Sequence, residues 1–220
     1  MTAPRLLVDI VTDFVCPWCY VGLRSFGAAK GDLAASHQVL PRFRAYQLNP
    51  GAPEEGVDRE AHYAEKFPNA GFRAAMRARL IEAAAEADFA FDPGRPQRLP
   101  NTIMAHQVLR WAHFDGLQEA VALRLYAGYW EEDADLGDAL TLTRLAGEAG
   151  MDEDETARKL AARADRKAVE TEAAMMRAGG VTGVPTFIVN ERAGFSGALP
   201  PRGLAAALRK AADAGAETAR

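Results

Sequence analysis

The stretch Cys16-Pro17-Trp18-Cys19 contains both cysteines of this 220-residue chain, and its position decides the fold that we expect. It follows the apolar run LLVDIV at residues 6–11, which predicts a buried strand, and it begins a helix expected over residues 16–30. The start of a helix has free N–H groups and the positive end of the dipole, and both favour a thiolate. Two thiols at this spacing can close an intramolecular disulfide and exchange electrons with another dithiol.

A second signal lies far downstream, where Val184-Pro185 opens the apolar stretch at residues 186–189. Proline has no N–H for a strand ladder, so it suits the first position of a strand. The peptide bond before it is also a candidate for the cis form. The two signals in this order are more specific than either signal alone.

Two other interpretations of the cysteine pair are weaker. A structural zinc site needs two more ligands at a workable spacing. No two of the four histidines form a close pair in the sequence; they are His37, His62, His106 and His113. A structural disulfide between Cys16 and Cys19 would enclose almost no loop and would remove little chain entropy. We therefore expect no metal and favour a redox pair.

Several stretches together carry a family signature: TDFVCPWCYVG at residues 12–22, YQLNP at 46–50, LPNT with Ala-His at 99–106, GVPTF at 183–187, and FSGA before Pro-Pro at 195–201. On these stretches the chain resembles the thioredoxin superfamily, and within it the DsbA-like proteins of the FrnE type. The resemblance implies an α/β fold, thioredoxin-like and interrupted by a large all-helical insertion. It also implies that Val184 and Pro185 lie opposite the cysteines, where the Val184 backbone can pair with an extended substrate.

The position of each thiol suggests its role. Cys16 is closer to the helix N-terminus than Cys19, so Cys16 is the candidate nucleophile and Cys19 the candidate resolving thiol. Pro17 suits the first helical turn, where a missing N–H costs little. Trp18 either covers the thiols and offers apolar surface to a substrate, or is a half-exposed packing residue.

Three further residues are candidates for auxiliary roles, each with a structural alternative. Asp13 can accept a proton from Cys19 during exchange, or it can form a turn at the end of the strand. Asn101 belongs to the family signature but also suits a helix N-cap. His106 either faces the site from the insertion or is a satisfied helix histidine.

Composition limits the partners. The net charge is −4, from 26 basic and 30 acidic residues, and it argues against nucleic acid as the main partner. Arg73, Arg77 and Arg79 form a small cluster on an expected helix, which we interpret as a solvated face. No apolar run is long enough to span a membrane, and the N-terminus does not resemble a secretory signal. We therefore expect a cytoplasmic protein without a membrane partner.

The pattern of strands and helices predicts two parts. Residues 1–54 and 177–220 form a discontinuous thioredoxin-like domain, and residues 55–176 form the helical insertion. We expect strands near residues 6–12, 38–47, 186–189 and 193–196, and a last helix opened by Pro200 and Pro201. The insertion is expected to form one wall of a substrate cleft rather than an independent domain.

Our first functional hypothesis is a thiol–disulfide oxidoreductase or isomerase that acts on protein or small-molecule disulfides. It needs no cofactor beyond its own redox-active disulfide, with glutathione as a candidate co-substrate. The alternative is a glutathione-dependent small-molecule isomerase or transferase on the same fold, and a third class is a non-catalytic binding module. The presence of Cys19 beside Cys16 favours dithiol chemistry. The sequence leaves open the substrate, the direction of electron flow, the reduction potential and the oligomeric state.

Overall fold

The protein is described by a computed structural model over residues 3–217. In chain order, its elements are β1 Arg5–Thr12, α1 Pro17–Leu33, β2 Gln38–Ala45, β3 Val57–Asp58, α2 Arg59–Lys66, α3 Ala70–Glu86, β4 Arg98–Leu99, α4 Ile103–Phe114, α5 Gln118–Glu132, α6 Ala139–Glu148, α7 Glu153–Ala161, α8 Arg166–Ala178, β5 Thr186–Val189, β6 Ala193–Ser196 and α9 Pro201–Glu217. Within residues 3–217, no helix combines the length and apolarity needed to span a bilayer.

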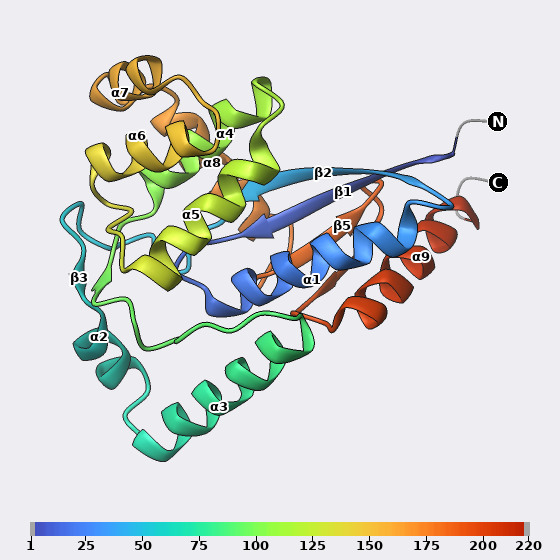
Figure 1. Ribbon diagram of the computed structural model, residues 1–220, viewed down its shortest axis with the longest axis horizontal. Coiled ribbons are helices and arrows are strands. Elements are labelled where there is room, and N and C mark those ends of the chain that lie inside the picture. The colour runs from blue at the N-terminus through green and yellow to red at the C-terminus, as the bar shows by residue number, and fades with distance from the viewer. Residues whose placement is uncertain (1–2, 218–220) are drawn as a thin grey trace.

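The main sheet has the strand order β2-β1-β5-β6. β1 and β2 are parallel and are joined by α1, which is the expected crossover unit. β5 runs antiparallel to β1 and forms a hairpin with β6. The sheet is therefore built from the two ends of the chain, and everything between β2 and β5 is inserted into it (Figure 1).

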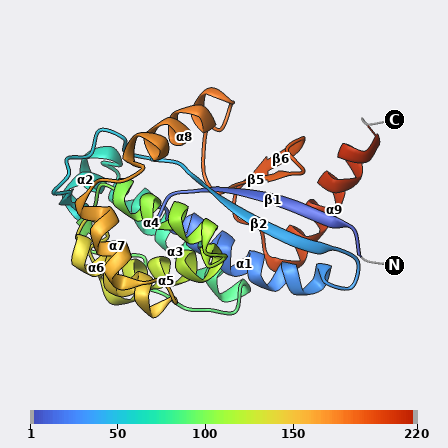
Figure 2. The same cartoon turned by 90° about the horizontal axis from the view of Figure 1, so that it is seen from above.

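One face of the sheet is apolar and is covered by α1 and α9, which pack side by side (Figures 1 and 2). Alternate residues of β1 point to this face, in keeping with the period of a strand. The buried core there includes Leu6, Val8 and Ile10 of β1, Phe26 of α1 and Leu208 of α9. The same cluster continues without a break into α4 and α5 of the insertion. The two parts of the chain thus share one core.

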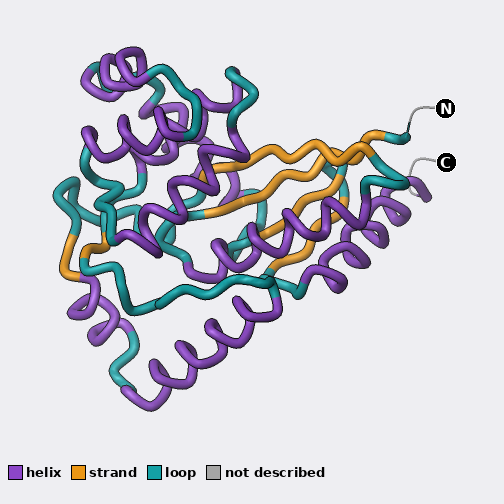
Figure 3. The backbone as a smooth tube through the Cα atoms, viewed as in Figure 1, coloured by secondary structure: helices purple, strands orange, loops and turns teal. Residues whose placement is uncertain are grey.

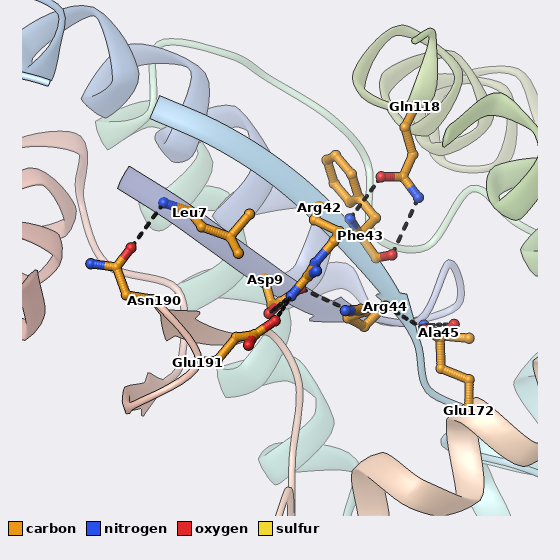
Figure 4. A network of polar contacts seen from close by, with 10 residues as sticks. All are labelled: Leu7, Asp9, Arg42, Phe43, Arg44, Ala45, Gln118, Glu172, Asn190 and Glu191. Atoms are coloured by element: carbon orange, nitrogen blue, oxygen red, sulfur yellow. Dashed lines mark hydrogen bonds and ion pairs between the residues drawn. The ribbon is translucent and has the colours of Figure 1, made fainter. Parts of the chain in front are cut away.

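The opposite face carries charged side chains near the middle of β1 and β2 (Figure 4). Asp9 lies in register with Arg42 on the neighbouring strand and is only 4% exposed. Its carboxylate accepts hydrogen bonds from Arg42 at 2.5 and 2.7 Å and from Arg44 at 2.8 Å. Arg42 also binds Glu191, and Arg44 also binds Glu172 of α8. Each charge of this network therefore has at least one opposite partner.

The insertion is helical except for one short ladder, which corrects the expectation of an all-helical segment. β3 and β4 pair antiparallel, with Val57 opposite Leu99. Strands of two residues give too short an alternation to be recognised from sequence. The paired strands bring together the two ends of a segment that contains α2, α3 and a long loop. This loop follows α3 and is the teal segment that passes α1 in Figure 3.

One helix end differs from expectation. α1 continues through Gly31 to Leu33, which is fully buried, because burial of this leucine outweighs the roughly 1 kcal/mol that a glycine costs a helix. α8 ends at Ala178 with Gly179 as its C-cap, two residues beyond the last residue of the predicted insertion. The division of the chain into 1–54 with 177–220 and 55–176 stays a prediction.

Candidate active site

The thiol pair lies at the junction of β1 and α1. Cys16 is the N-cap of α1, with extended backbone angles, and its carbonyl accepts from the amides of Cys19 at 3.1 Å and Tyr20 at 3.4 Å. The amide of Cys16 in turn donates to the carbonyl of Asp13 at 3.0 Å. Cys16 is 5% exposed and Cys19 is 1% exposed, and neither is in a disulfide. Cys16 is thus at the helix start, and Cys19 lies one turn further inside.

The loop before β5 lies against the thiol of Cys16. The sulfur of Cys16 is 3.5 Å from the carbonyl oxygen of Val184, to which the thiol donates. The peptide bond between Val184 and Pro185 is cis. Gly22 of α1 allows the close approach, since a Cβ atom there would lie 2.9 Å from Cγ of Pro185. The structure therefore brings together Cys16, Cys19, Val184 and Pro185 from the two ends of the chain.

Two polar residues near Cys19, Thr12 and Tyr126, were not singled out from the sequence. Burial raises the pKa of Cys19 well above the usual value for a thiol, and the adjacent Cys16 raises it further, whereas the hydroxyl of Thr12 lowers it. Thr12 shares a hydrogen bond with the hydroxyl of Tyr126, which also donates to the carbonyl of Asp13 at 3.0 Å. Tyr126 comes from α5, 114 positions away from Thr12. A contact over this distance in the chain leaves no local signal in the sequence.

Asp13 and His106 form a buried pair that holds the loop after β2. One carboxylate oxygen of Asp13 accepts from the amide of Leu48 at 2.8 Å, and the other lies 3.5 Å from Nε2 of His106. Nε2 of His106 donates to the carbonyl of Tyr46 at 3.0 Å. Neither the second oxygen of Asp13 nor Nδ1 of His106 has a hydrogen-bond partner among the described residues. The pair therefore anchors the loop but leaves two buried polar atoms unsatisfied.

The other auxiliary candidate, Asn101, makes local structural contacts. Its side-chain oxygen accepts from the amide of Ile103 at 3.1 Å, and its nitrogen donates to the carbonyl of Ala52 at 2.7 Å. The N-cap of α4 is Thr102 and not Asn101, but the first contact still satisfies the amide of the first helical residue. The second ties the loop before β3 to this helix.

Trp18 and Pro17 border the thiols on the side of α3. Trp18 is half-buried and packs against the main core and against a smaller cluster formed by Val21, Leu80 and Ala84. Pro17, the first residue of α1, lines a pocket of about 270 Å³ whose remaining lining comes from the insertion. Arg73 and Arg77 line this pocket; the side chain of Arg77 is 54% exposed, as expected of a solvated face, whereas that of Arg73 is 28% exposed. The sequence also gave no reason to single out Arg59 and Tyr63, which line it as well.

No metal site is visible within residues 3–217, since no group of three or more His, Cys, Asp or Glu side chains is placed to hold an ion. The only two cysteines of the chain are the thiol pair itself. The chemistry that this arrangement supports is that of the two thiols and of the groups around them.

These features define a protein of the thioredoxin-fold class with a helical insertion. The chain belongs to the family of DSBA-like thioredoxin domains, which matches residues 7–209. A probable DsbA oxidoreductase from Streptomyces coelicolor is 28% identical in sequence, with a TM-score of 0.82 over 94% of this chain and 89% of that one. The uncharacterised protein YwbO of Bacillus subtilis is 24% identical over 84% of this chain and 86% of its own length. The cytosolic disulfide reductase DsbM of Pseudomonas aeruginosa, in a structure with GSH, shares the fold, with 19% identity, a TM-score of 0.62, and 93% and 98% coverage.

Proposed function

We propose that the protein is a thiol–disulfide oxidoreductase in which Cys16 is the nucleophile and Cys19 the resolving thiol. The observation that carries the proposal is that two free, buried thiols lie at the start of α1 in a DSBA-like domain, Cys16 as the N-cap and Cys19 one turn further inside. A thiol at a helix N-terminus is stabilised as the thiolate, whereas burial keeps Cys19 protonated until it is needed.

The exchange proceeds in two balanced steps. The Cys16 thiolate attacks one sulfur of the substrate disulfide, so that a Cys16–substrate disulfide forms and the other substrate sulfur leaves as a thiolate that takes up a proton. Cys19 then loses its proton and attacks the sulfur of Cys16, which releases the second substrate thiol. The substrate gains two electrons, and the enzyme ends with a Cys16–Cys19 disulfide. The reverse sequence oxidises a substrate dithiol.

The surroundings of Cys16 support the binding of a substrate backbone. The carbonyl of Val184 accepts from the Cys16 thiol, and this bond is given up when Cys16 ionises. The carbonyl is then free to accept from the amide of an extended substrate, in the manner of strand addition. Pro17 and Trp18 supply the apolar border for the segment that flanks the substrate sulfur.

Glutathione is the proposed co-substrate that returns the enzyme to its starting state. The two-electron cycle needs a thiol donor or a disulfide acceptor, and two glutathione molecules can supply or accept the two electrons. A neighbour of the same fold, the reductase DsbM, is described with GSH. The alternative, a glutathione-dependent isomerase or transferase, needs one activating group at the position of Cys16 and has no use for Cys19.

The decisive experiment compares single cysteine variants of the purified protein. Cys19→Ser should accumulate a mixed disulfide with substrate, visible as a mass increase, whereas Cys16→Ser should form none and lose turnover. Both variants keep the burial of the site, because serine is no larger than cysteine. Full activity of Cys16→Ser in insulin reduction and in oxidation of a reduced protein would overturn the proposal. Full activity of Cys19→Ser would instead favour the alternative function, a glutathione-dependent isomerase or transferase.

We also propose that the protein belongs to the FrnE-type branch of the family and that it is located in the cytoplasm. In a reducing compartment a catalytic disulfide is transient, so the thiol pair should be reduced at steady state. Rapid acid quenching of cells followed by alkylation measures this redox state directly. A pair found fully oxidised, in a fraction released from the cell envelope, would contradict the location.

A further inference from the structure

The pocket beside Pro17 is lined mainly by positively charged and apolar side chains. Among the described residues, three arginines line it, namely Arg59, Arg73 and Arg77, and one acidic side chain, Glu60. That side chain is 79% exposed and lies 3.8 Å from Arg73, so solvent screens its charge. The pocket is therefore a positively charged recess that opens next to the first residue of α1.

Arg59 is the unusual member of the three, because it is buried without an acidic partner. The residue is 8% exposed, and none of the carboxylates whose side chains the structure describes forms an ion pair with it. Its guanidinium donates to the carbonyl of Pro93 at 2.8 Å, and it stacks over the rings of Tyr63 at 4.8 Å and Trp130 at 5.2 Å. Its Nε atom is buried and has no hydrogen-bond partner in the described part of the chain.

A buried charge without a counterion is costly, and proteins normally pair it. Backbone carbonyls and aromatic faces stabilise the guanidinium of Arg59 but do not neutralise it. Asp9 on the sheet shows the contrast, since its buried charge meets two arginines. The unpaired charge of Arg59 in the lining of the pocket indicates that the pocket can receive an anion.

The other two arginines are held at the rim. Arg73 donates to the carbonyl of Phe67 at 2.7 Å, which fixes its guanidinium. Arg77 pairs with Asp92 at 2.7 Å, and both of these side chains are more than half exposed. An exposed pair of this kind is weak and can open to admit a competing carboxylate. The rim thus adds attraction, whereas Arg59 supplies the buried contact.

The rest of the lining is apolar, and the pocket is small. Tyr63, Met76 and Leu80 contribute apolar surface. A volume of about 270 Å³ lies below the range of roughly 300–1,000 Å³ that is usual for a whole drug-sized ligand. It suits a short chain of methylene groups that ends in one carboxylate.

The pocket is also close to the reacting thiol. Pro17 belongs to its lining and is the next residue after Cys16. Tyr63 connects the two electrostatically: burial raises its pKa, the charge of Arg59 lowers it, and the negative charge of Cys16 raises it again. A ligand arm in the pocket would therefore extend toward Cys16.

We propose that this pocket is a subsite for the carboxylate-bearing arm of a small-molecule disulfide, with the carboxylate at Arg59 and the disulfide directed to Cys16. The inference rests on the proposed function and names its substrate class. Carboxylate recognition by a buried guanidinium is strong and specific, because both oxygens can accept from the planar donor group.

The test uses two disulfides that differ only in charge: 3,3′-dithiodipropionate and its uncharged bis-amide. The wild-type protein should have a kcat/KM about tenfold or more higher for the diacid, as expected for hydrogen bonds to charged groups. Arg59→Met should lower the diacid-to-diamide ratio about tenfold. Arg79→Met is the matched control, because Arg79 stands on the same helix as Arg77 but does not line the pocket, and its ratio should stay at the wild-type value.

Two additions make the outcome decisive. If Arg59→Met fails to fold, Arg73→Met at the rim must lower the same ratio, and an unchanged ratio overturns the subsite. Suberate, in which methylene groups replace both sulfurs, should bind to Cys16→Ser by calorimetry and lose binding in Cys16→Ser/Arg59→Met. Suberate binding without any disulfide turnover by the wild type would reject the proposed function but keep the subsite. Equal turnover of diacid and diamide, or a stronger preference for a disulfide in an acidic peptide, would reject the subsite and leave the function standing.

Discussion

Asp9 and Asp13 are two buried carboxylates four residues apart, and their surroundings are opposite. Asp9 lies on the sheet, where Arg42 and Arg44 meet its charge directly (Figure 4). Asp13 lies at the end of β1, 1% exposed, where one oxygen binds a backbone amide and the other faces only His106. In the middle of the sheet the buried charge of Asp9 is paired with opposite charges, whereas polar atoms near the end of β1 have no hydrogen-bond partner among the described residues.

This difference separates a region that stabilises the fold from a region where reactive groups are placed. Buried polar groups without partners are costly, so proteins keep few of them and keep them where chemistry occurs. The unpartnered atoms of Asp13 and His106 lie beside the junction that contains the thiols. Four substitutions test the comparison, and they are taken from the largest expected effect to the smallest.

Replacing Asp9 by alanine should cause the largest loss of stability. Breaking a buried ion pair costs about 3–5 kcal/mol, and we expect about 3 kcal/mol here, since Arg42 retains Glu191 and Arg44 retains Glu172. Urea unfolding measures the change, and activity per folded molecule should stay constant. The control is Glu155→Ala, which removes an exposed i,i+4 partner of Lys159 and should cost less than about 1 kcal/mol. If Asp9→Ala and Glu155→Ala lost the same free energy of unfolding, the ion pairs of Asp9 would not stabilise the fold more than an exposed pair does.

Replacing Gly22 by alanine tests the packing at the site. The new Cβ atom would lie 2.9 Å from Cγ of Pro185, a ring atom that cannot rotate away, so the loop at 184–185 must shift from the thiol. Overpacking of this kind costs about 1–3 kcal/mol, and turnover should fall as well. Gly27→Ala on the same helix is the control, since its Cβ atom would meet nothing within 4 Å. It should gain up to about 1 kcal/mol in stability and leave turnover unchanged.

The sequence was sufficient where the signal is local. The thiol pair at a strand-to-helix junction and the strands expected at residues 186–189 and 193–196 depend on neighbours within a few residues. The pocket at Pro17 could not be predicted in this way. It forms only when residues 59–94 fold back onto the start of α1, and no periodic pattern connects these segments.

Local rules also failed where distant packing decides the outcome. Gly31 favours a helix end. The helix α1 nevertheless continues to Leu33, because the side chain of Leu33 is buried in the core. The two residues of β3 pair with a strand about forty positions away and leave no alternation of their own. In both cases the deciding contact is made by a part of the chain that a short window of sequence does not include.

Replacing Thr12 by valine should change the titration of Cys19. The native state holds the Cys19 proton more tightly than the unfolded chain, so this group's contribution to stability is complete below the unfolded thiol pKa of about 8.5. It is lost as the pH rises through the higher folded value. In the reduced protein, alkylation of Cys19 should therefore begin only at a pH above that at which an unperturbed thiol reacts.

The valine removes the hydroxyl that lowers the Cys19 pKa, so alkylation of Cys19 should need a still higher pH. A Cys16→Ser background leaves one thiol and makes the measurement unambiguous. Tyr126→Phe is the control, because it removes the partner of Thr12 but keeps the hydroxyl. It should cost about 1 kcal/mol of stability and shift the alkylation midpoint less than Thr12→Val does. A larger shift in Tyr126→Phe would assign the effect to the tyrosine instead.

Replacing Asp13 by asparagine should have the smallest effect on stability, although the residue is among the most buried of the chain. Asparagine keeps an oxygen for the amide of Leu48 and removes only the charge, which faces no Lys or Arg among the described residues and has the ring of His106 at 3.5 Å. The free energy of unfolding should change by less than about 1 kcal/mol, against about 3 kcal/mol for the loss of Asp9. Asp138→Asn, at the N-cap of α6, is the matched control, since asparagine caps a helix as well as aspartate does.

The same variant decides whether the Asp13 carboxylate takes part in the exchange. The carboxylate faces the amide of Leu48 and the ring of His106, whereas the contact of this residue with Cys19 is made by its backbone. We therefore expect the Cys19 step, followed as release of substrate thiol from the preformed mixed disulfide, to slow less than tenfold. A proton acceptor contributes about 10²–10⁴ to such a step. A loss of that size, recovered as the pH is raised, would show that the unpartnered oxygen of Asp13 takes the proton of Cys19 and that its isolation from cations serves the reaction.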